Sequence, residues 1–252
     1  MRILCYGGGT NSTALLVECV KRQIEIDLIL FADTGGEKPH TYKYLKLFSK
    51  WLLKYGMPEI TRVQRTNING SFITLEGYCL QKNQLPSLAY GFKSCSQKHK
   101  IQPQDKYLNN WQPAKAAWKR GEKITKLIGY DADEPHRAKS FSDKKYVLEY
   151  PLIDWGMGRD ECVKSIEEAG LPLPGKSACF FFCPSSKKAE ILKLKQEYPD
   201  LAERALNMEA RVELTKIKGL GRSFSWGELL QGGKHLHSNP NIEIDCGCYD
   251  GA

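Results

Sequence analysis

A glycine-rich turn near the N-terminus is the segment of this chain with the clearest capacity for chemistry. The apolar run of residues 1–6 leads directly into three glycines at positions 7–9, and a helix-like segment follows. Glycine lets a backbone come close to an anion, and a helix N-terminus adds N–H donors and the positive end of its dipole. The hydroxyls of Ser12 and Thr13 are further donors. The pattern predicts a site for the phosphates of a nucleotide.

A second loop follows the next apolar run, residues 26–31, and begins with an acidic residue. In parallel sheets, ligands bind outside the carboxyl ends of neighbouring strands, so we expect this loop to lie beside the glycine turn. Asp33 is placed to bind Mg²⁺ or a ribose hydroxyl. The residues predicted to bind the nucleotide are Gly7, Gly8, Gly9, Asn11, Ser12, Thr13, Asp33, Thr34 and Gly35.

Four segments, in order along the chain, resemble the signatures of a known family. They are GGGTNS at 7–12, FADTGGEKPHTY at 31–42, CSQKHKIQP at 95–103 and GYDADEPHR at 129–137. The first resembles the pyrophosphate loop of the PP-loop, or adenine nucleotide α-hydrolase, superfamily. The others resemble segments of its phosphoadenosine-phosphosulfate (PAPS) reductase branch. Where the family has a serine and an aspartate, this chain has Gly7 and Asn11, so phosphate binding would depend more on backbone N–H groups and Ser12.

The alternation of strand-like and helix-like runs predicts an α/β fold: a three-layer parallel sheet with helices on both faces, PP-loop or Rossmann-like. We expect residues 1–155 to form the nucleotide-binding domain. Residues 156–252 should form a helical, cysteine-containing region packed on the same domain. The expected strands are 3–6, 27–31, 60–63, 125–129 and 146–150, and the expected helices are 12–22, 40–55, 103–119, 159–169, 186–197 and 201–216. Residues 66–100 are expected to form a long functional loop or lid.

Several of the nine cysteines lie at short spacing in separate segments, as a zinc ion or an iron–sulfur cluster requires. The resemblance implies a [4Fe–4S] cluster held by Cys95, Cys179 and Cys183, with the fourth iron either open or bound by Cys246 or Cys248. The alternative is that Cys179 and Cys183 are core residues beside the three phenylalanines between them.

The net charge of +8 suits an anionic partner, either a nucleotide alone or a nucleic acid such as tRNA or DNA. No apolar stretch approaches the roughly 20 residues that cross a bilayer, and the N-terminus lacks the pattern of a signal peptide. The sequence therefore predicts a cytoplasmic location and no membrane partner.

The resemblance implies an enzyme that splits ATP, with Mg²⁺, into AMP and pyrophosphate and activates an oxygen for replacement by sulfur. Lys100 and Arg137 would neutralise charge developing at phosphorus. The acceptor would be nucleic acid, as in tRNA thiolation or DNA phosphorothioation, and the sulfur donor a protein such as a cysteine desulfurase.

Two alternatives remain open. In a PAPS or adenosine-phosphosulfate reductase, Cys246 would attack sulfur and release sulfite, with thioredoxin as the reductant. In a non-catalytic sensor or partner subunit, the nucleotide would bind without reaction.

Overall fold

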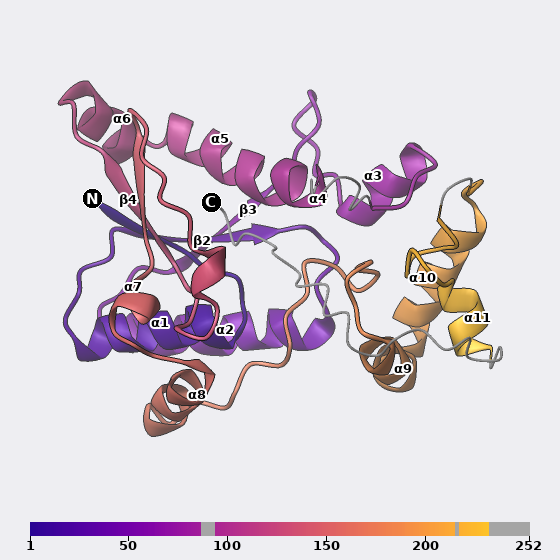
Figure 1. Ribbon diagram of the computed structural model, residues 1–252. Helices are drawn as coiled ribbons and strands as arrows, with labels where there is room; N and C mark the ends of the chain where they lie inside the picture. Colours follow the sequence, from indigo (N-terminus) through magenta and orange to yellow (C-terminus); the bar gives the residue numbers. More distant parts are fainter. Residues whose placement is uncertain (87–93, 215–216, 232–252) are drawn as a thin grey trace.

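A parallel sheet organises the computed structural model, which describes residues 1–86, 94–214 and 217–231 (Figure 1). Its strands are β1 (Arg2–Cys5), β2 (Leu28–Asp33), β3 (Ile60–Gln64), β4 (Ile124–Ile128) and β5 (Tyr146–Glu149). They lie in the order β3-β2-β1-β4-β5 and all pairings are parallel. The five strands predicted from the sequence are confirmed. All six residues of β2 are buried, as expected for a central strand covered on both faces.

Helices cover both faces of the sheet, which confirms the predicted three-layer α/β fold. Helices α1 (Thr10–Lys21) and α2 (Pro39–Lys54) lie below the sheet in Figure 1. Helices α5 (Gln102–Asn110) and α6 (Gln112–Lys119) lie above it. Leu4, Leu15 and Phe48 belong to the core on the lower side, whereas Ile3 and Leu108 belong to the core on the upper side.

The single helix expected at 103–119 is two helices, and proline explains the break. Trp111, between α5 and α6, has an extended backbone with ψ 121°. Pro113 follows two residues later, where it can donate no backbone N–H to continue the α5 ladder. The helix prediction is therefore correct on both sides of Trp111. The break itself is not visible in the hydrophobic periodicity.

The prediction of a long loop at 66–100 is also wrong in part, because short secondary-structure elements occupy the described residues of this range. A hairpin bridge joins Thr66 to Phe72, and α3 (Leu75–Gln81) follows, capped by the Thr74 hydroxyl. After residues 87–93, which lie outside the described residues, come α4 (Ser94–Ser96) and the π-helix η2 (Gln97–Ile101). Such short elements show too few residues for periodicity to be recognised.

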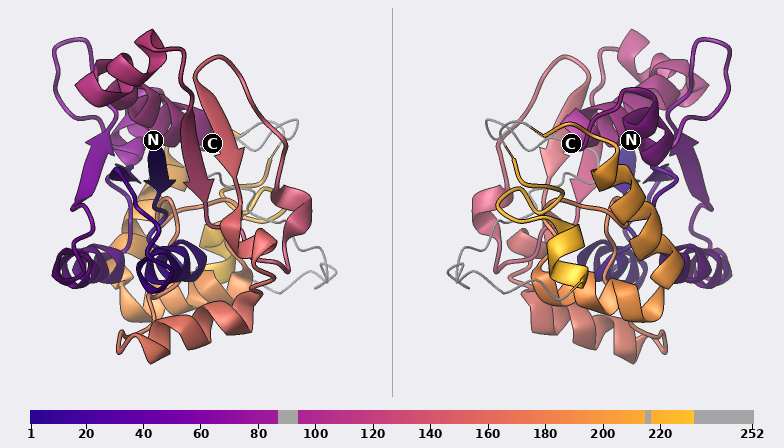
Figure 2. Two further views of the ribbon diagram at one scale, coloured as in Figure 1. Left: turned by 90° about the vertical axis from the view of Figure 1, so that its left-hand side faces the viewer. Right: turned by 90° about the vertical axis from the view of Figure 1, so that its right-hand side faces the viewer.

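The later part of the chain first returns to the sheet and then forms a separate lobe. The short helix α7 (Pro151–Asp154) leads to α8 (Arg159–Glu168), which packs against α1. Helices α9 (Lys188–Glu197), α10 (Pro199–Ala210) and α11 (Trp226–Leu230) then form a lobe facing the carboxyl edge of the sheet (Figure 2). The helix expected at 201–216 thus ends earlier than predicted. In the described part of the chain, no helix is long and apolar enough to cross a membrane.

A buried carboxylate holds the lobe together. Glu209 accepts hydrogen bonds from the backbone N–H groups of Leu220, Trp226 and Gly227, at 2.6–2.9 Å. Three donors offset the cost of burying the charge. They also tie the start of α11 to the end of α10, and so give the lobe its own internal order.

Candidate functional site

The glycine turn lies where the direction of winding of the sheet reverses. From β1 the chain winds outward through β2 and β3, while β4 and β5 lie on the other side of β1. In sheets of this kind the usual ligand site is the crevice expected at the switch point, here outside the carboxyl ends of β1 and β4. Residues 7–9 follow β1 directly and lead into α1, so they occupy this position.

The turn leaves the N-terminus of α1 without a side-chain cap. Gly8 has φ +74°, a left-handed conformation that glycine adopts without strain. The N-cap residue, Gly9, has no side chain to cap the helix, and the first turn of α1 contains no acidic residue. The first N–H groups of α1 and its dipole are therefore directed to the crevice without a capping side chain, an arrangement suited to an anion.

The two hydroxyls expected to contact phosphate instead shape the turn. Ser12 Oγ accepts from the Gly7 N–H at 3.2 Å and is 3.3 Å from the Gly9 carbonyl oxygen. Thr13 Oγ1 donates to the same carbonyl at 2.8 Å and lies 3.1 Å from the Tyr6 hydroxyl. These bonds hold the turn in one conformation, so backbone N–H groups are the principal donors that it presents.

A polar network spans the crevice. Asn11 Nδ2 donates to Asp131 Oδ2 at 2.7 Å, which joins the start of α1 to the loop after β4. Arg159, at the start of α8, donates to Asn11 Oδ1 at 2.8 Å and to Thr10 Oγ1 at 2.9 Å. The amide of Asn11 is thus fixed by a cation on one side and a carboxylate on the other.

Asp33 is the buried centre of a second network. Its Oδ1 accepts from the Gly35 N–H and the Tyr42 hydroxyl, both at 2.8 Å, and its Oδ2 accepts from Gln64 at 3.0 Å and from Arg62. Burial alone would raise the pKa of Asp33, but these hydrogen bonds, led by that from Arg62, hold the pKa below its usual value. Asp33 is ionised and fixes the rim of the site.

The segment between α8 and α9 forms a roof over the glycine turn. Ser177 approaches Gly9 so closely that a methyl group added to Gly9 would lie 2.8 Å from Ser177 Oγ. The hydroxyl of Thr34 donates to the carbonyl oxygen of Cys179. The Phe181 N–H donates to the Gly36 carbonyl at 2.8 Å. Two chain segments 145 residues apart are therefore joined at the candidate site.

The roof brings cysteines close to the site. Cys79, Cys95, Cys179 and Cys183 are buried in one apolar cluster, which includes three of the four predicted ligands and the phenylalanines of the alternative interpretation. Burial raises the pKa of Cys79 to about 12. Among the described residues, no three His, Cys, Asp or Glu side chains are placed to hold a metal ion. Cys246 and Cys248 lie outside the described residues.

The described thiols do not by themselves form the expected cluster site, so the cluster remains a prediction of the resemblance. It predicts visible absorbance, iron and acid-labile sulfide in anaerobically purified protein, or zinc without colour. Loss of the metal in Cys179→Ala, but not in Cys19→Ala, would support it, because Cys19 is buried in the other core. A colourless, metal-free wild-type protein would exclude it.

The two cations expected to act at phosphorus occupy different surroundings. Lys100 is buried in η2, which packs beside β2. Arg137 donates to Glu134 at 2.6 Å and lies 4.3 Å from the Tyr130 ring centroid, on the loop after β4. Arg137 is thus held by a carboxylate and an aromatic face in this structure.

Three residues of the site had no signal in the sequence analysis: Arg62, Arg159 and Ser177. Arg62 lies on β3 and reaches Asp33 across the sheet, whereas Arg159 and Ser177 come from distant segments. Asp131 lies within the segment 129–137, which resembles a family signature, but had no predicted role. Strand order alone could have suggested Asp131, because it follows β4 at the switch point.

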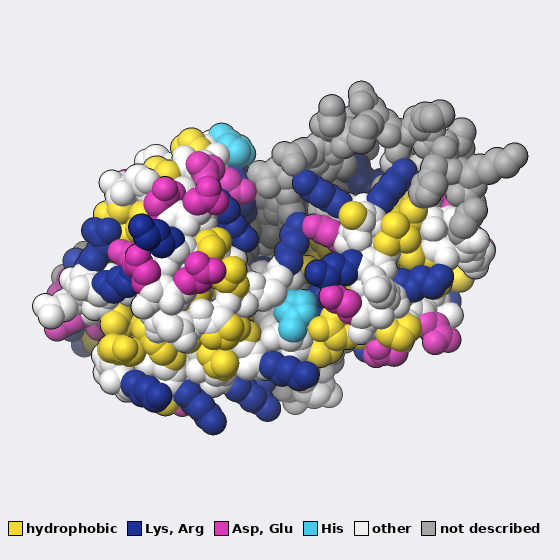
Figure 3. Space-filling model, turned by 90° about the horizontal axis from the view of Figure 1, so that it is seen from below, with side chains coloured by type: hydrophobic (Ala, Val, Ile, Leu, Met, Phe, Trp, Pro, Cys, Tyr) yellow, Lys and Arg dark blue, Asp and Glu magenta, His cyan; other side chains and the backbone are white. Residues whose placement is uncertain are grey.

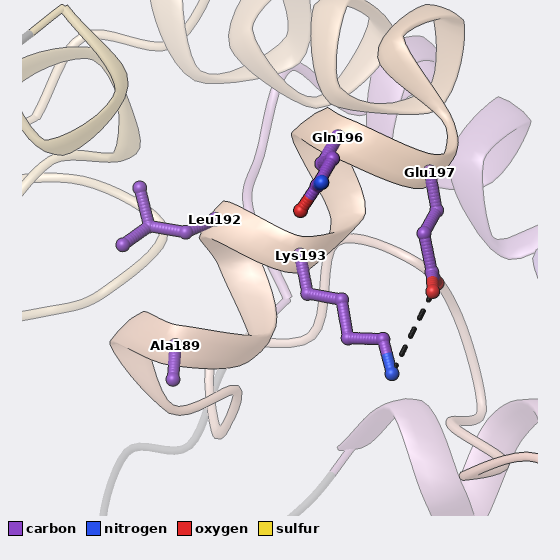
Figure 4. A pocket seen from close by; sticks show the side chains of 5 residues that line it. All are labelled: Ala189, Leu192, Lys193, Gln196 and Glu197. Carbon is purple, nitrogen blue, oxygen red and sulfur yellow. Dashed lines mark ion pairs between the residues drawn. The ribbon is translucent and has the colours of Figure 1, made fainter.

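A shallow pocket on the outer face of α9 does not compete with this site. It is lined by Ala189, Leu192, Lys193, Gln196 and Glu197 (Figure 4). Lys193 and Glu197 form an ion pair at 3.6 Å, one helical turn apart. The pair is an ordinary solvent-exposed helix pair, and the pocket presents no convergent set of polar groups.

Comparisons with known proteins add one distant relative. No protein-family model matches the sequence. An uncharacterised protein of Methanocaldococcus jannaschii is 23% identical over 250 residues, which cover 89% of this chain and 51% of that protein. The chain thus spans about half the length of the curated relative it matches. Since this relative carries no stated activity, function has to be inferred from the site.

Proposed function

We propose that this protein is a cytoplasmic adenylating enzyme of the PP-loop type, which binds ATP at the glycine turn and cleaves it between the α- and β-phosphates. The observation that supports this most directly is the uncapped N-terminus of α1 at the switch point, with Asn11 and Arg159 beside it. An uncapped helix end flanked by a cation suits a pyrophosphate group.

The polar residues of the crevice have distinct roles in this proposal. Backbone N–H groups at the start of α1 bind the pyrophosphate, and Arg159 lies close enough to the turn to share its charge. Asp33 is a positioning residue that orients Arg62 and the second loop. Lys100 and Arg137 keep their predicted roles in neutralising charge at phosphorus.

The carboxylates of the crevice suit Mg²⁺, which proteins bind through one or two carboxylates together with substrate phosphates. Asp131 would hold the ion, because each of its oxygens accepts one hydrogen bond and retains further acceptor capacity. When bound, the ion supplies charge neutralisation for the leaving pyrophosphate.

The product of this step is an activated oxygen. An oxygen of the acceptor attacks the α-phosphorus, the bond to the β-phosphate oxygen breaks, and pyrophosphate leaves. The terminal persulfide sulfur of a donor such as a cysteine desulfurase then bonds to the acceptor atom, which is carbon in tRNA thiolation and phosphorus in DNA phosphorothioation. A second thiol, from the donor or a cellular reductant, cleaves the S–S bond to the donor and forms a disulfide with it, which leaves the transferred sulfur at the oxidation level of sulfide. AMP leaves with the original oxygen. The net charge of +8 supports a nucleic-acid acceptor.

The proposal is tested by incubating the full chain with ATP, Mg²⁺ and total tRNA or genomic DNA, and measuring AMP and pyrophosphate. We expect both products, in equal amounts, with stimulation by one of the nucleic acids. Arg159→Ala should lower the rate on the order of a hundredfold, as the loss of an electrostatic group does at other sites of charge development. Arg159→Lys should recover part of it.

Parallel reactions distinguish the alternatives. Sulfite release from PAPS with reduced thioredoxin, abolished in Cys246→Ser, would replace this proposal by the reductase. Nucleotide binding in calorimetry without any product from either ATP or PAPS would replace it by the sensor.

A further inference from the structure

A hairpin of residues 65–73 projects from the carboxyl end of β3 (Figure 1). Thr66 and Phe72 form an antiparallel bridge, and the Asn67 N–H donates to the Ser71 carbonyl at 2.8 Å. The side-chain oxygen of Asn69 closes the tip by accepting from both the N–H and the hydroxyl of Ser71. The hairpin is thus ordered by its own hydrogen bonds. Binding of a partner would therefore carry little entropic cost from ordering this loop.

The base of the hairpin belongs to the rim of the candidate site. Gln64, at the end of β3, donates to Asp33, and the Leu75 N–H donates to the Thr34 carbonyl at 2.9 Å. A methyl group added to Gly35 would lie 2.9 Å from Phe72 Cζ. A large substrate with its reacting oxygen at the nucleotide would therefore extend across this hairpin.

Three cationic side chains lie on or beside the hairpin. The Arg65 guanidinium lies 4.5 Å from the centroid of the Tyr78 ring, and Lys98 Nζ donates to the Tyr78 hydroxyl at 3.0 Å. Lys106, from α5, donates to the Thr66 hydroxyl at 2.8 Å. None of the three forms an ion pair with a carboxylate in the described ranges, so their charge is not compensated locally.

The tip carries an apolar side chain in full contact with solvent. Ile68 is fully exposed, and Phe72 below it is 39% exposed. Asn67 and Asn69 flank Ile68 with amide groups. An apolar contact flanked by hydrogen-bonding side chains, in front of cations, suits an unpaired base attached to its phosphate backbone.

The opposite face of the molecule carries cations that are remote from the hairpin. Seen from below, Lys and Arg lie beside Asp and Glu over part of this face and form a row along one edge of it (Figure 3). Helix α2 lies on that side and carries exposed lysines, including Lys50. Lys50 therefore provides a matched cation remote from the hairpin.

We propose that the hairpin surface, formed by Arg65, Ile68, Lys98 and Lys106, binds a single-stranded segment of nucleic acid. The cations contact consecutive phosphates and Ile68 packs against a base. This inference rests on the proposed function for the purpose of the contact, but the binding itself requires no ATP.

The test is fluorescence anisotropy of the full chain with labelled strands about 20 nucleotides long, which exceed the site size of typical single-strand binders. The probes are single-stranded RNA, single-stranded DNA of the same sequence, and the DNA duplex. We expect a single strand to bind more tightly than the duplex. Lys98→Gln and Lys106→Gln should each weaken binding several-fold and reduce the slope of log K against log salt by about one.

Two further variants and a control complete the test. Ile68→Asp should weaken binding about tenfold because it replaces an apolar contact by a like charge to phosphate, while Ile68→Leu should retain affinity. Lys50→Gln should change neither affinity nor salt slope by as much as Lys98→Gln. Thermal unfolding of each variant separates loss of binding from loss of fold.

Equal effects of Lys50→Gln and Lys98→Gln, or no binding by wild-type protein, would overturn the proposal. Polyglutamate serves as a further probe. If it binds as tightly as the single strands, and if Ile68→Asp does not weaken strand binding, the surface recognises an acidic protein and the proposal is overturned. ATP cleavage is measured on the same samples. Strand binding without cleavage contradicts the proposed function alone, whereas cleavage without hairpin-dependent binding contradicts this inference alone.

Discussion

A methyl group added at Gly129 is expected to disable the candidate site and destabilise the protein. The new Cβ of Gly129→Ala would lie 2.8 Å from Ser12 Cα and 2.9 Å from the Ser12 nitrogen, both backbone atoms. No side-chain rotation can relieve these contacts, so the end of β4 and the first turn of α1 must move apart. Overpacking of this kind costs about 3 kcal/mol of the free energy of unfolding.

The same displacement should separate Asn11 from Asp131 and misplace the start of α1. A misplacement of about 1 Å can cost on the order of a hundredfold in rate. Urea unfolding measures the stability, and pyrophosphate release from ATP measures the site. Gly227→Ala is the control, because its added methyl meets its nearest neighbours at 3.6 and 3.8 Å, which is ordinary contact. Equal stability and activity in Gly129→Ala and wild type would show that β4 and α1 do not determine each other's position.

The central strands were predictable because their signal is local and strong. β1 and β2 are short, nearly continuous apolar runs, and burial on both faces of a parallel sheet requires that pattern. The glycine turn could be placed beside Asp33 for the same reason, since both follow strands that are neighbours in the sheet.

The rest of the site was not predictable because its contacts join distant segments. Arg159 reaches Thr10 across 149 residues, and Cys179 meets Thr34 across 145. No periodicity or spacing encodes such pairs. For Ser12 and Thr13 the sequence was misleading in the opposite way. Their hydroxyl groups suggested contact with a ligand, but in the structure these groups form hydrogen bonds within the turn itself.

His99 is expected to make the stability of the protein depend strongly on pH. Its side chain is 1% exposed in η2, and Arg65 Nη1 lies 3.2 Å from Nε2. Arginine can only donate, so Nε2 accepts and the proton of the neutral ring is on Nδ1. Burial first, then the charges of Arg65 and Lys98, lower the pKa of His99 to about 4 from its usual 6.5.

The direction of the effect follows from proton linkage. Between about pH 6.5 and pH 4 the unfolded chain binds a proton at this histidine and the folded chain does not, so the free energy of unfolding falls as the pH falls. The contribution is fully present above pH 6.5 and is lost by about pH 4. A pKa difference of this size corresponds to about 3 kcal/mol.

Urea unfolding of wild type and His99→Gln across this pH range isolates the contribution. Glutamine can still accept a hydrogen bond from Arg65 but does not titrate, and the carboxylates titrate in both proteins and cancel in the comparison. We expect the wild type to lose about 2–3 kcal/mol more than His99→Gln between pH 7 and pH 4.5. Arg65→Gln should reduce the difference, because it removes the nearest cation. Parallel curves for wild type and His99→Gln would mean that folding does not lower the pKa of His99, and would contradict this prediction.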